Sequence, residues 1–358
     1  MEGVAVHVVA PAAKGLPASE QIDGIPVTRF RYAPRDYETL AYTGTMVDSV
    51  AGSWSGKFAM VSFLGAAFMA MLRERRVFQP DIIHAHWWFP NGLVGMWTST
   101  FTKVPLVTTM HGTDIRMLST VPALKPLARH VLNRSTSVTT VSHWLAQQGE
   151  TLMARTTPLV APMPAAVEWF TPAGARIPDR ILFVGRLNAQ KGIEYAIRAI
   201  AAMSTPASLD VIGTSPSVSD YQTLAKTLGV ADRIFFLGAI AQHELAPFYR
   251  RAAALVVPSI DEGLGLVAVE AQLCETPVVA FASGGITDVI QHERTGLLVP
   301  PHNVEALASA LDRLLHSPPL AAELGRAGRE QALTTFAPTS VAHRYAGIYR
   351  EALQRRAA

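Results

Sequence analysis

Short apolar runs alternate with longer helical patterns along most of the chain. Most of these runs are continuous rather than alternating, which is typical of strands buried on both faces of a sheet. A first series lies at 4–10, 27–32, 81–85, 106–109 and 137–141, and a second at 180–185, 209–212, 234–237, 254–258 and 277–280. Helical patterns include 191–203, 304–315, 321–333 and a last one at about 338–355. This alternation of strand and helix predicts an α/β fold with doubly wound parallel sheets.

The two series of strands predict two domains. Residues 156–178, which separate them, contain five prolines and show no clear period, so we interpret this stretch as a hinge. A length of 358 residues also suits two cores better than one. We therefore expect an N-terminal domain at 1–165, a C-terminal domain at 166–338, and a C-terminal helix at 339–358 that crosses back to the N-terminal domain.

The composition narrows the class of protein. Hydrophobic residues make up 49% of the chain and charged residues 16%, which is typical of a globular protein. The net charge of +3 suits an anionic ligand or an anionic membrane surface, but it is not spread as a nucleic-acid footprint. The single cysteine, Cys274, excludes an internal disulfide, and we expect it to be a small core residue. No secretory signal opens the printed sequence, and we expect a cytoplasmic protein.

The longest uncharged apolar stretch runs from residue 58 to residue 72. It is shorter than the roughly 18 residues that a membrane span requires, and it contains Ser62 and Gly65. Three arginines follow it, namely Arg73, Arg75 and Arg76. We expect a buried helix of an α/β domain, with a basic amphipathic helix on a membrane surface as the alternative.

The most informative stretch is 258–270, where a predicted buried strand ends and a helix begins near Gly265. Open α/β sheets bind ligands at the carboxyl ends of their strands. Glycine lets the backbone approach a ligand closely, and a helix start offers free N–H groups to a phosphate. Glu262 and Glu270 flank this anion site. Because carboxylates repel phosphate, we expect them to bind hydroxyl groups on either side of a diphosphate, one on a sugar and one on a ribose.

A second motif runs from residue 183 to residue 192. A predicted buried strand ends at Gly185, and two cations, Arg186 and Lys191, follow as a helix begins. Arg186 is able to grip phosphate oxygens through a bidentate fork, and Lys191 acts as a point charge. We therefore expect both cations to converge on one diphosphate.

Together the two motifs, Gly-Arg-Leu-x3-Lys-Gly and Glu-Gly-x-Gly-Leu-x3-Glu, resemble those of retaining GT-B glycosyltransferases, specifically the large family 4. Further matching segments extend along nearly the whole chain. They are Asp-Ile-Ile-His-Ala-His (81–86), His-Gly-Thr-Asp (111–114), Val-Ser (141–142), Phe-Leu-Gly (236–238), Ser-Gly-Gly-Ile (283–286) and Gly-Leu-Leu-Val-Pro (296–300). The resemblance implies a GT-B fold, in which two Rossmann-like domains face one another across a cleft.

The resemblance also implies which residues bind a nucleotide diphosphate sugar. They are Arg186, Lys191, Gly238, Glu262, Gly263, Leu264, Gly265, Leu266 and Glu270. Arg186 and Lys191 would hold the phosphates, and Glu270 would bind the ribose hydroxyls. Glu262 would contact the donor sugar, together with backbone N–H groups near Leu264 and Gly265. Gly238 and its neighbours would lie against the base.

Catalysis, by the same resemblance, would involve His111, Glu262, Arg186 and Lys191. His111 would face the donor sugar from the end of a first-domain strand. The leaving phosphate would take the acceptor's proton on the face of attack, so we expect no side-chain nucleophile and no Ser-His-Asp triad. The sequence contains no Asp-x-Asp pair, so we expect no metal and no cofactor; fixed cations and a helix N-terminus would neutralise the leaving group.

Two further histidines, His84 and His86, lie at a predicted strand end. Histidines at this spacing suggest a metal, but no third ligand is evident, and we expect the two side chains to point to opposite faces. Packing in the core or cleft, or contact with the acceptor, are the remaining interpretations. The aromatic residues at 87–89 either stack on a sugar or lipid acceptor or belong to the core. The same ambiguity applies to Trp54, Phe58 and Phe63.

The chain departs from the family pattern at its start. Family members open with a strand, a glycine-rich loop and a long helix that leads through a turn into the second strand. Here the sequence begins almost at that turn, with Glu2-Gly3-Val4, so the first predicted strand corresponds to the family's second. We expect the first strand and helix of the N-terminal domain to be missing, through either an upstream natural start or a genuinely short form.

The leading interpretation is a hexosyltransferase that transfers sugar from a UDP- or GDP-sugar. Its acceptor would be a carbohydrate, a lipid-linked or a small molecule, in polysaccharide, glycolipid or glycoconjugate synthesis. We expect it in the cytoplasm, with peripheral contact at the inner face of the membrane, and without a nucleic-acid partner. One alternative is a truncated or degenerate GT-B protein that binds a nucleotide sugar without turnover, and another is a GT-B-like sugar-nucleotide epimerase. The intact charged motifs favour the transferase, whereas the missing first strand favours the degenerate protein.

Overall fold

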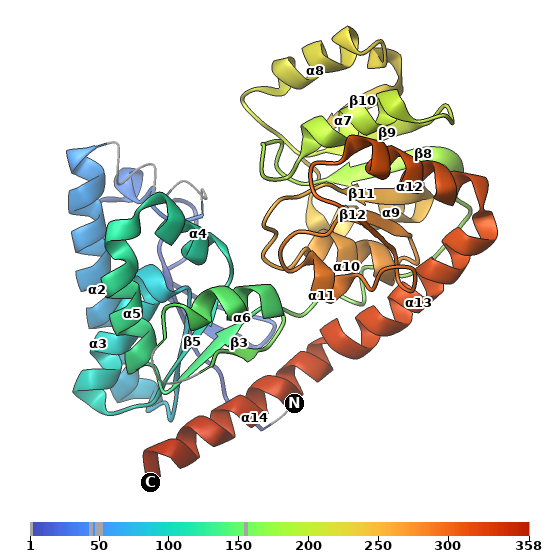
Figure 1. Ribbon diagram of the computed structural model, residues 1–358. Helices are drawn as coiled ribbons and strands as arrows, with labels where there is room; N and C mark the ends of the chain where they lie inside the picture. The colour runs from blue at the N-terminus through green and yellow to red at the C-terminus, as the bar shows by residue number, and fades with distance from the viewer. Residues whose placement is uncertain (1–2, 43–45, 47–52, 154–156, 358) are drawn as a thin grey trace.

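Parallel strands flanked by helices build both halves of the molecule, as the computed structural model shows (Figure 1). The structure describes residues 3–42, 46, 53–153 and 157–357. Within this part of the chain, the first half contains two sheets and the second half contains one. The architecture is therefore the α/β arrangement with parallel sheets that the sequence pattern predicts.

The first half contains a mixed sheet and a parallel sheet. The mixed sheet has the order β1-β3-β2, with β1 (Val8–Pro11), β2 (Ser19–Ile22) and β3 (Ile25–Phe30). The parallel sheet has the order β4-β5-β6-β7, with β4 (Ile83–His86), β5 (Leu106–Met110), β6 (Ser137–Thr140) and β7 (Leu159–Val160). No strand of the described part pairs with the outer edge of β1 or of β4.

Helices cover the first-half sheets. They are α2 (Trp54–Phe78), α3 (Leu93–Thr102), α4 (Thr113–Thr120), α5 (Lys125–Arg134) and α6 (His143–Glu150). Short turns of helix lie at Arg35–Tyr37, Trp88–Gly92 and Pro122–Leu124. Ser53 and Ser142 cap α2 and α6 through their side-chain oxygens, which satisfies backbone N–H groups of the first turn.

The second half contains one parallel sheet in the order β10-β9-β8-β11-β12-β13. Its strands are β8 (Ile177–Val184), β9 (Ser208–Ile212), β10 (Ile234–Gly238), β11 (Ala252–Val257), β12 (Val278–Phe281) and β13 (Leu297–Val299). Its helices are α7 (Ile193–Ala202), α8 (Val218–Thr227), α9 (Ala246–Arg251), α10 (Leu266–Leu273), α11 (Ile286–Val289), α12 (Val304–His316) and α13 (Pro318–Phe336), with short turns at Ala231–Arg233 and Gln242–Glu244. The strand order reverses between β8 and β11, and such a switch point is where doubly wound sheets bind ligands. Both charged motifs follow these two strands.

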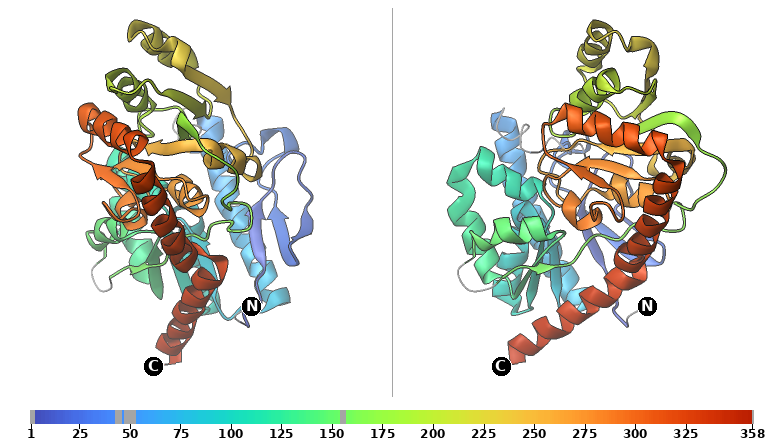
Figure 2. Two further views of the ribbon diagram at one scale, coloured as in Figure 1. Left: turned by 90° about the vertical axis from the view of Figure 1, so that its right-hand side faces the viewer. Right: turned by 45° about the vertical axis from the view of Figure 1, so that its right-hand side comes forward.

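The last helix, α14 (Pro338–Ala357), returns from the second half and runs along the first (Figures 1 and 2). Its Ile348 and Ala352 form a small buried cluster with Val107 of β5 and with Ala161. The helix also reaches a polar group of the first half, because the Tyr349 hydroxyl lies 2.7 Å from His84 Nδ1. The C-terminal segment thus joins the two halves through both apolar and polar contacts.

Helix α2 corrects the prediction of a buried helix. It extends over 25 residues, and its buried residues are Gly56, Met60, Phe63 and Ala67. The opposite face is open, with Trp54 77% and Phe58 73% exposed. Composition alone does not reveal that one narrow stripe is enough to pack a helix against its neighbours.

Phe63 is a core residue, with its ring 5.1 Å from those of Phe30 and Tyr32. By length and composition α2 is also able to span a membrane, contrary to the expectation from 58–72 alone.

A matched pair of glycines tests how the two motif loops are held together. Gly174 and Gly192 both have a φ of +71°, but only at Gly192 would a Cβ meet another group, 1.9 Å from the Pro258 carbonyl oxygen. Gly174→Ala should cost about 1–2 kcal/mol, from the left-handed backbone alone. Gly192→Ala should lower the free energy of unfolding by at least about 2 kcal/mol more, because the turn after β8 must move from the end of β11. Urea denaturation measures both, and equal losses would contradict this packing.

Candidate functional site

The two motif loops lie beside one another at the carboxyl ends of the adjacent strands β8 and β11. The backbone N–H of Ile260, in the loop after β11, donates a hydrogen bond to the Gln190 carbonyl oxygen at 2.8 Å. The second loop leads into α10, which begins at Leu266 after Gly265 in the left-handed conformation, at a φ of +94°. The predicted helix start near Gly265 is confirmed. The N-termini of α7 and α10 therefore open at one place, which suits an anion.

An ion pair joins the two loops. Lys191 Nζ lies 2.6 Å from Glu262 Oε2, and the side chains are only 21% and 10% exposed. Asn188 supports this geometry because its Oδ1 accepts the backbone N–H of Lys191 at 2.9 Å. Arg186 is exposed at the end of β8 and has no ion pair with another described residue. The structure thus brings Lys191 and Glu262 together and leaves the guanidinium of Arg186 facing solvent.

Glu270 lies in the middle of α10 and is 4% exposed. Its Oε1 accepts a hydrogen bond from Gln242 Nε2 at 2.6 Å, and its Oε2 accepts one from the Tyr249 hydroxyl at 2.7 Å. Burial raises the pKa of this carboxyl above its ordinary value, and the two hydrogen bonds oppose that shift. Sequence reasoning missed Gln242 and Tyr249, because no motif spacing connects them with Glu270.

The loop that carries Glu262 is wedged between the two halves of the molecule. A Cβ on Gly263 would stand 2.6 Å from the His111 carbonyl oxygen. On the other side, the Gly285 N–H donates to the Glu262 carbonyl oxygen at 2.6 Å. Arg116 Nη2 also donates to the Asp261 carbonyl oxygen at 3.0 Å, across the same junction. Because Gly263 has no side chain, the loop that carries Glu262 is able to contact the backbone of His111, the residue predicted to face the donor sugar.

His111 lies directly after β5 at this junction. Its Nε2 is 2.8 Å from His86 Nδ1, and its Nδ1 is 3.3 Å from Met163 Sδ. Because a thioether sulfur only accepts, this geometry assigns the Nδ1–H tautomer to His111 and leaves Nε2 as an acceptor. Burial, with a smaller contribution from the neighbouring His86, lowers the pKa of His111 to about 4. The ring is therefore neutral near pH 7.

The expectation that His84 and His86 point to opposite faces is wrong. Their rings lie 4.5 Å apart and are tilted by 31°, because side chains two residues apart in a strand share a face. His84 also contacts Thr109 Oγ1 at 2.6 Å, and burial lowers its pKa to about 3. Within the described residues, no three His, Cys, Asp or Glu side chains are grouped so as to hold a metal.

Asp114 is a site residue that sequence reasoning missed, although it belongs to the quoted His-Gly-Thr-Asp segment. It is 3% exposed, and its Oδ1 accepts the backbone N–H groups of His111 at 3.1 Å and Gly112 at 2.9 Å. Its backbone carbonyl accepts the indole N–H of Trp88 at 2.8 Å. Asp114 therefore fixes the turn that carries His111. Trp88 is fully buried, whereas Trp87 is 44% exposed beside the His111 ring.

The remaining predicted donor residues lie around this junction and along the same sheet edge. Leu264 is buried at 5% exposure, and Leu266 is partly buried at the start of α10. Gly238 ends β10, two strands from β8, and its carbonyl oxygen accepts the Gly213 N–H at 2.8 Å. Cys274 is buried, which raises its pKa to about 11 and agrees with the predicted core role.

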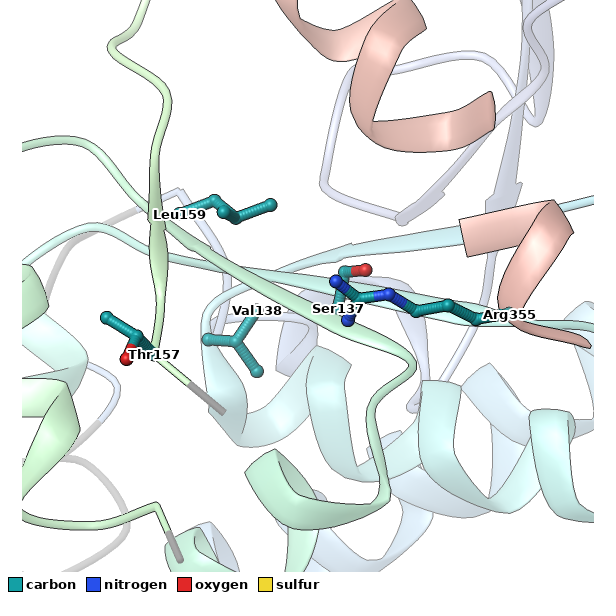
Figure 3. Close-up of a pocket in the computed structure, with 5 residues that line it drawn as sticks. All are labelled: Ser137, Val138, Thr157, Leu159 and Arg355. Carbon is teal, nitrogen blue, oxygen red and sulfur yellow. The ribbon is translucent and has the colours of Figure 1, made fainter. Parts of the chain in front are cut away.

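A separate hollow of about 190 Å³ lies far from these residues in the sequence, at β6, β7 and the end of α14 (Figure 3). It is lined by Ser137, Val138, Thr157, Leu159 and Arg355. None of the predicted site residues lines it, and its single charged group is an arginine whose Nη1 lies 3.5 Å from the Thr136 carbonyl oxygen. The predicted site residues therefore lie away from this hollow.

Comparison with known proteins identifies the family of the chain. Residues 175–331 match the family described as glycosyl transferases group 1, and residues 2–163 match the glycosyl transferase 4-like domain. The D-inositol 3-phosphate glycosyltransferase of Acidothermus cellulolyticus is 34% identical over 323 residues, which cover 80% of this chain and 71% of that protein. A glycosyltransferase of Methanocaldococcus jannaschii is 31% identical over 278 residues, which cover 70% of this chain and 71% of that protein.

Solved structures show the same fold. Sucrose-phosphate synthase from Thermosynechococcus elongatus superposes with a TM-score of 0.80 at 24% identity, over 98% of this chain and 89% of that chain. The Anabaena protein Alr3699/HepE, in complex with UDP and glucose, superposes with a TM-score of 0.74 at 17% identity, over 96% and 99%. Together with the charged motifs at the switch point, these matches show that the chain is a GT-B glycosyltransferase and belongs to the group 1, family 4-like glycosyltransferases.

Proposed function

We propose that this glycosyltransferase transfers a hexose from a UDP- or GDP-sugar to an acceptor hydroxyl, with retention of configuration and without a metal. The observation that carries the proposal is the Lys191–Glu262 ion pair at 2.6 Å, between the N-termini of two helices at the switch point. An ammonium and a carboxylate are the complementary partners for a diphosphate and for sugar hydroxyls, respectively.

The donor would exchange this internal pair for two contacts of its own. Its diphosphate takes Lys191, together with Arg186 and the N–H groups at the start of α10, which supply fixed positive charge. Glu262 then accepts hydrogen bonds from hydroxyls of the donor sugar. Glu270, held by Gln242 and Tyr249, accepts the ribose hydroxyls.

The chemistry would proceed on one face of the sugar. The bond between the anomeric carbon and the phosphate oxygen breaks, the acceptor oxygen bonds to the same face, and the acceptor's proton goes to the leaving phosphate. Neutral His111 accepts a hydrogen bond from a donor-sugar hydroxyl at Nε2, in place of His86. Asp114 takes no part as a nucleophile, because it is buried and occupied by the backbone N–H groups of its own turn.

We further propose a cytoplasmic enzyme with contact at the inner face of the membrane, in polysaccharide, glycolipid or glycoconjugate synthesis. Carbohydrates, lipid-linked and small molecules are all acceptors to be tested. The name of the Acidothermus relative makes D-inositol 3-phosphate the first small molecule to try. The alternative, a GT-B protein that binds a nucleotide sugar without turnover, draws on the edges of β1 and β4, with which no described strand pairs. Release of UDP or GDP with formation of a glycosylated acceptor distinguishes the two.

Turnover measurements test the metal-free neutralisation of the leaving group. Lys191→Ala should lower kcat about 100-fold, because one fixed charge at the leaving diphosphate is lost. Addition of EDTA to the wild type should leave kcat unchanged. The matched control is Lys226→Ala, on the exposed side of α8, which should behave as wild type. Loss of activity in EDTA and its restoration by Mg²⁺ would refute the proposed role of Lys191.

The role of Glu270 is tested by ribose discrimination. In calorimetry, wild type should bind the ribonucleotide about tenfold or more tightly than its 2′,3′-dideoxy form, because hydrogen bonds to a carboxylate are strong. Glu270→Gln should bind both forms with similar, weaker affinity. Glu194→Gln, whose carboxylate instead pairs with Arg198 on α7, should retain the discrimination. Full discrimination in Glu270→Gln would remove Glu270 from the ribose site.

The neutral state of His111 predicts its response to pH. Unfolded histidine has a pKa near 6.5, whereas burial lowers that of His111 to about 4. Between these two values the unfolded chain binds a proton that the folded chain does not, so this histidine makes stability decrease as the pH falls through that window. NMR titration of the ring, assigned through His111→Asn, should show no protonation at pH 6. A midpoint near 6.5 would contradict the proposed neutral acceptor.

A further inference from the structure

The outer face of α2 presents a row of large apolar side chains to solvent. Trp54, Phe58, Val61 and Met69 are 77%, 73%, 69% and 64% exposed. At 100° per residue these four positions fall within about 80° of one another around the helix axis. They form one stripe on the helix, interrupted by Gly65 between Val61 and Met69, which we call the α2 stripe. Single exposed apolar residues need no explanation, but a contiguous row of this kind marks an interaction surface.

Packing among the described residues does not account for the α2 stripe. The opposite side of the helix, at Met60, Phe63 and Ala67, already anchors α2 on the first half. Phe101 of α3 extends the apolar surface, because it is 74% exposed and its ring lies 5.6 Å from that of Phe68 in α2. Figure 1 shows α2 on the side of the first half that faces away from the second half. The surface is therefore separate from the domain junction that holds the candidate site.

The charges along α2 identify the chemistry of its partner. Lys57 lies at one end, with its Nζ 4.7 Å from the centre of the Trp54 ring. Three arginines lie at the other end, namely Arg73, Arg75 and Arg76. The single carboxylate of the helix, Glu74, lies 3.5 Å from His7 Nε2 and is mostly shielded from solvent. An apolar stripe between cations at both ends matches an anionic bilayer, with acyl chains below the stripe and headgroups at the cations.

We propose that α2 binds flat on an anionic lipid bilayer through the α2 stripe, with Lys57, Arg73 and Arg76 on lipid phosphates. A flat orientation follows from the fold, because spanning the bilayer would strip Met60 and Phe63 from their contacts in the first half. Docking on this side leaves the second half in water, where a nucleotide sugar is dissolved. This binding assigns a surface to the proposed membrane contact, and the delivery of lipid-linked acceptors to the first half rests on the proposed sugar transfer.

Vesicle co-sedimentation of the full chain tests the proposal. Wild type should bind vesicles of phosphatidylcholine with phosphatidylglycerol, and raised salt should weaken this binding. Phe58→Glu with Met69→Glu should lower the bound fraction about tenfold or more, because two charges would enter the interface. The matched control is Phe235→Glu with Leu333→Glu, at positions of the second half that are 41% and 37% exposed, and it should bind as wild type. Arg73→Gln with Arg76→Gln should lower binding to anionic vesicles in particular.

Three outcomes would overturn the proposal. The first is no vesicle binding by wild type, and the second is equal binding by wild type and by Phe58→Glu with Met69→Glu. The third is a wild-type dimer in ultracentrifugation that becomes a monomer in this variant, because the α2 stripe would then face a second copy. Thermal unfolding at the wild-type temperature shows that a variant is folded. Turnover of a soluble acceptor, measured on the same samples, keeps the two proposals apart: vesicle binding without turnover would count against the proposed function alone.

Discussion

The loop at 261–265 fits between the two halves of the molecule only because no side chain stands at Gly263. The His111 carbonyl oxygen would lie 2.6 Å from a Cβ there, and a Cβ on Gly284, on the opposite side of the loop, would lie 2.4 Å from the Glu262 carbonyl oxygen. This double contact sets the positions of the groups that carry the chemistry. Glu262 reaches Lys191, α10 starts at the next turn, and His111 of the first half is drawn to the same point.

Three acidic or histidine groups of the junction already have internal partners, whereas Arg186 faces solvent. Glu262 pairs with Lys191, Glu270 accepts from Gln242 and Tyr249, and His111 lies against His86. Such partners hold side chains in position before a ligand arrives, so a ligand loses less binding free energy to their ordering. They also stabilise charges that would otherwise be poorly solvated at a partly buried site. Glu270 and its partner Tyr249 are more deeply buried, at 4% and 0% exposure, which suits a fixed contact, whereas the Lys191–Glu262 pair suits exchange with a ligand.

The sequence predicted the fold and the two motif loops because their signals are local. Continuous apolar runs mark buried parallel strands, and glycines with charged residues after a strand mark ligand-binding turns. Gln242 and Tyr249 were missed because their roles depend on contacts with a distant segment. Asp114 was overlooked although its contacts with the backbone of His111 and Gly112 are local. The burial of α2 was misjudged because both of its faces are apolar, so composition does not tell which of them packs. The orientation of His84 and His86 was predictable, because residues two apart in a strand share a face. The expectation of opposite faces misapplied this period.

A structure with a bound nucleotide sugar tests the central claim most directly. The account predicts that Lys191 Nζ leaves Glu262 and contacts an oxygen of the diphosphate, while Glu262 accepts hydrogen bonds from hydroxyls of the sugar. Glu270 should contact the ribose and His111 the sugar. Two results would contradict the account. One is a nucleotide sugar bound elsewhere, for instance at the hollow beside Arg355. The other is a nucleotide sugar bound at the junction while the Lys191–Glu262 pair stays intact and does not contact it.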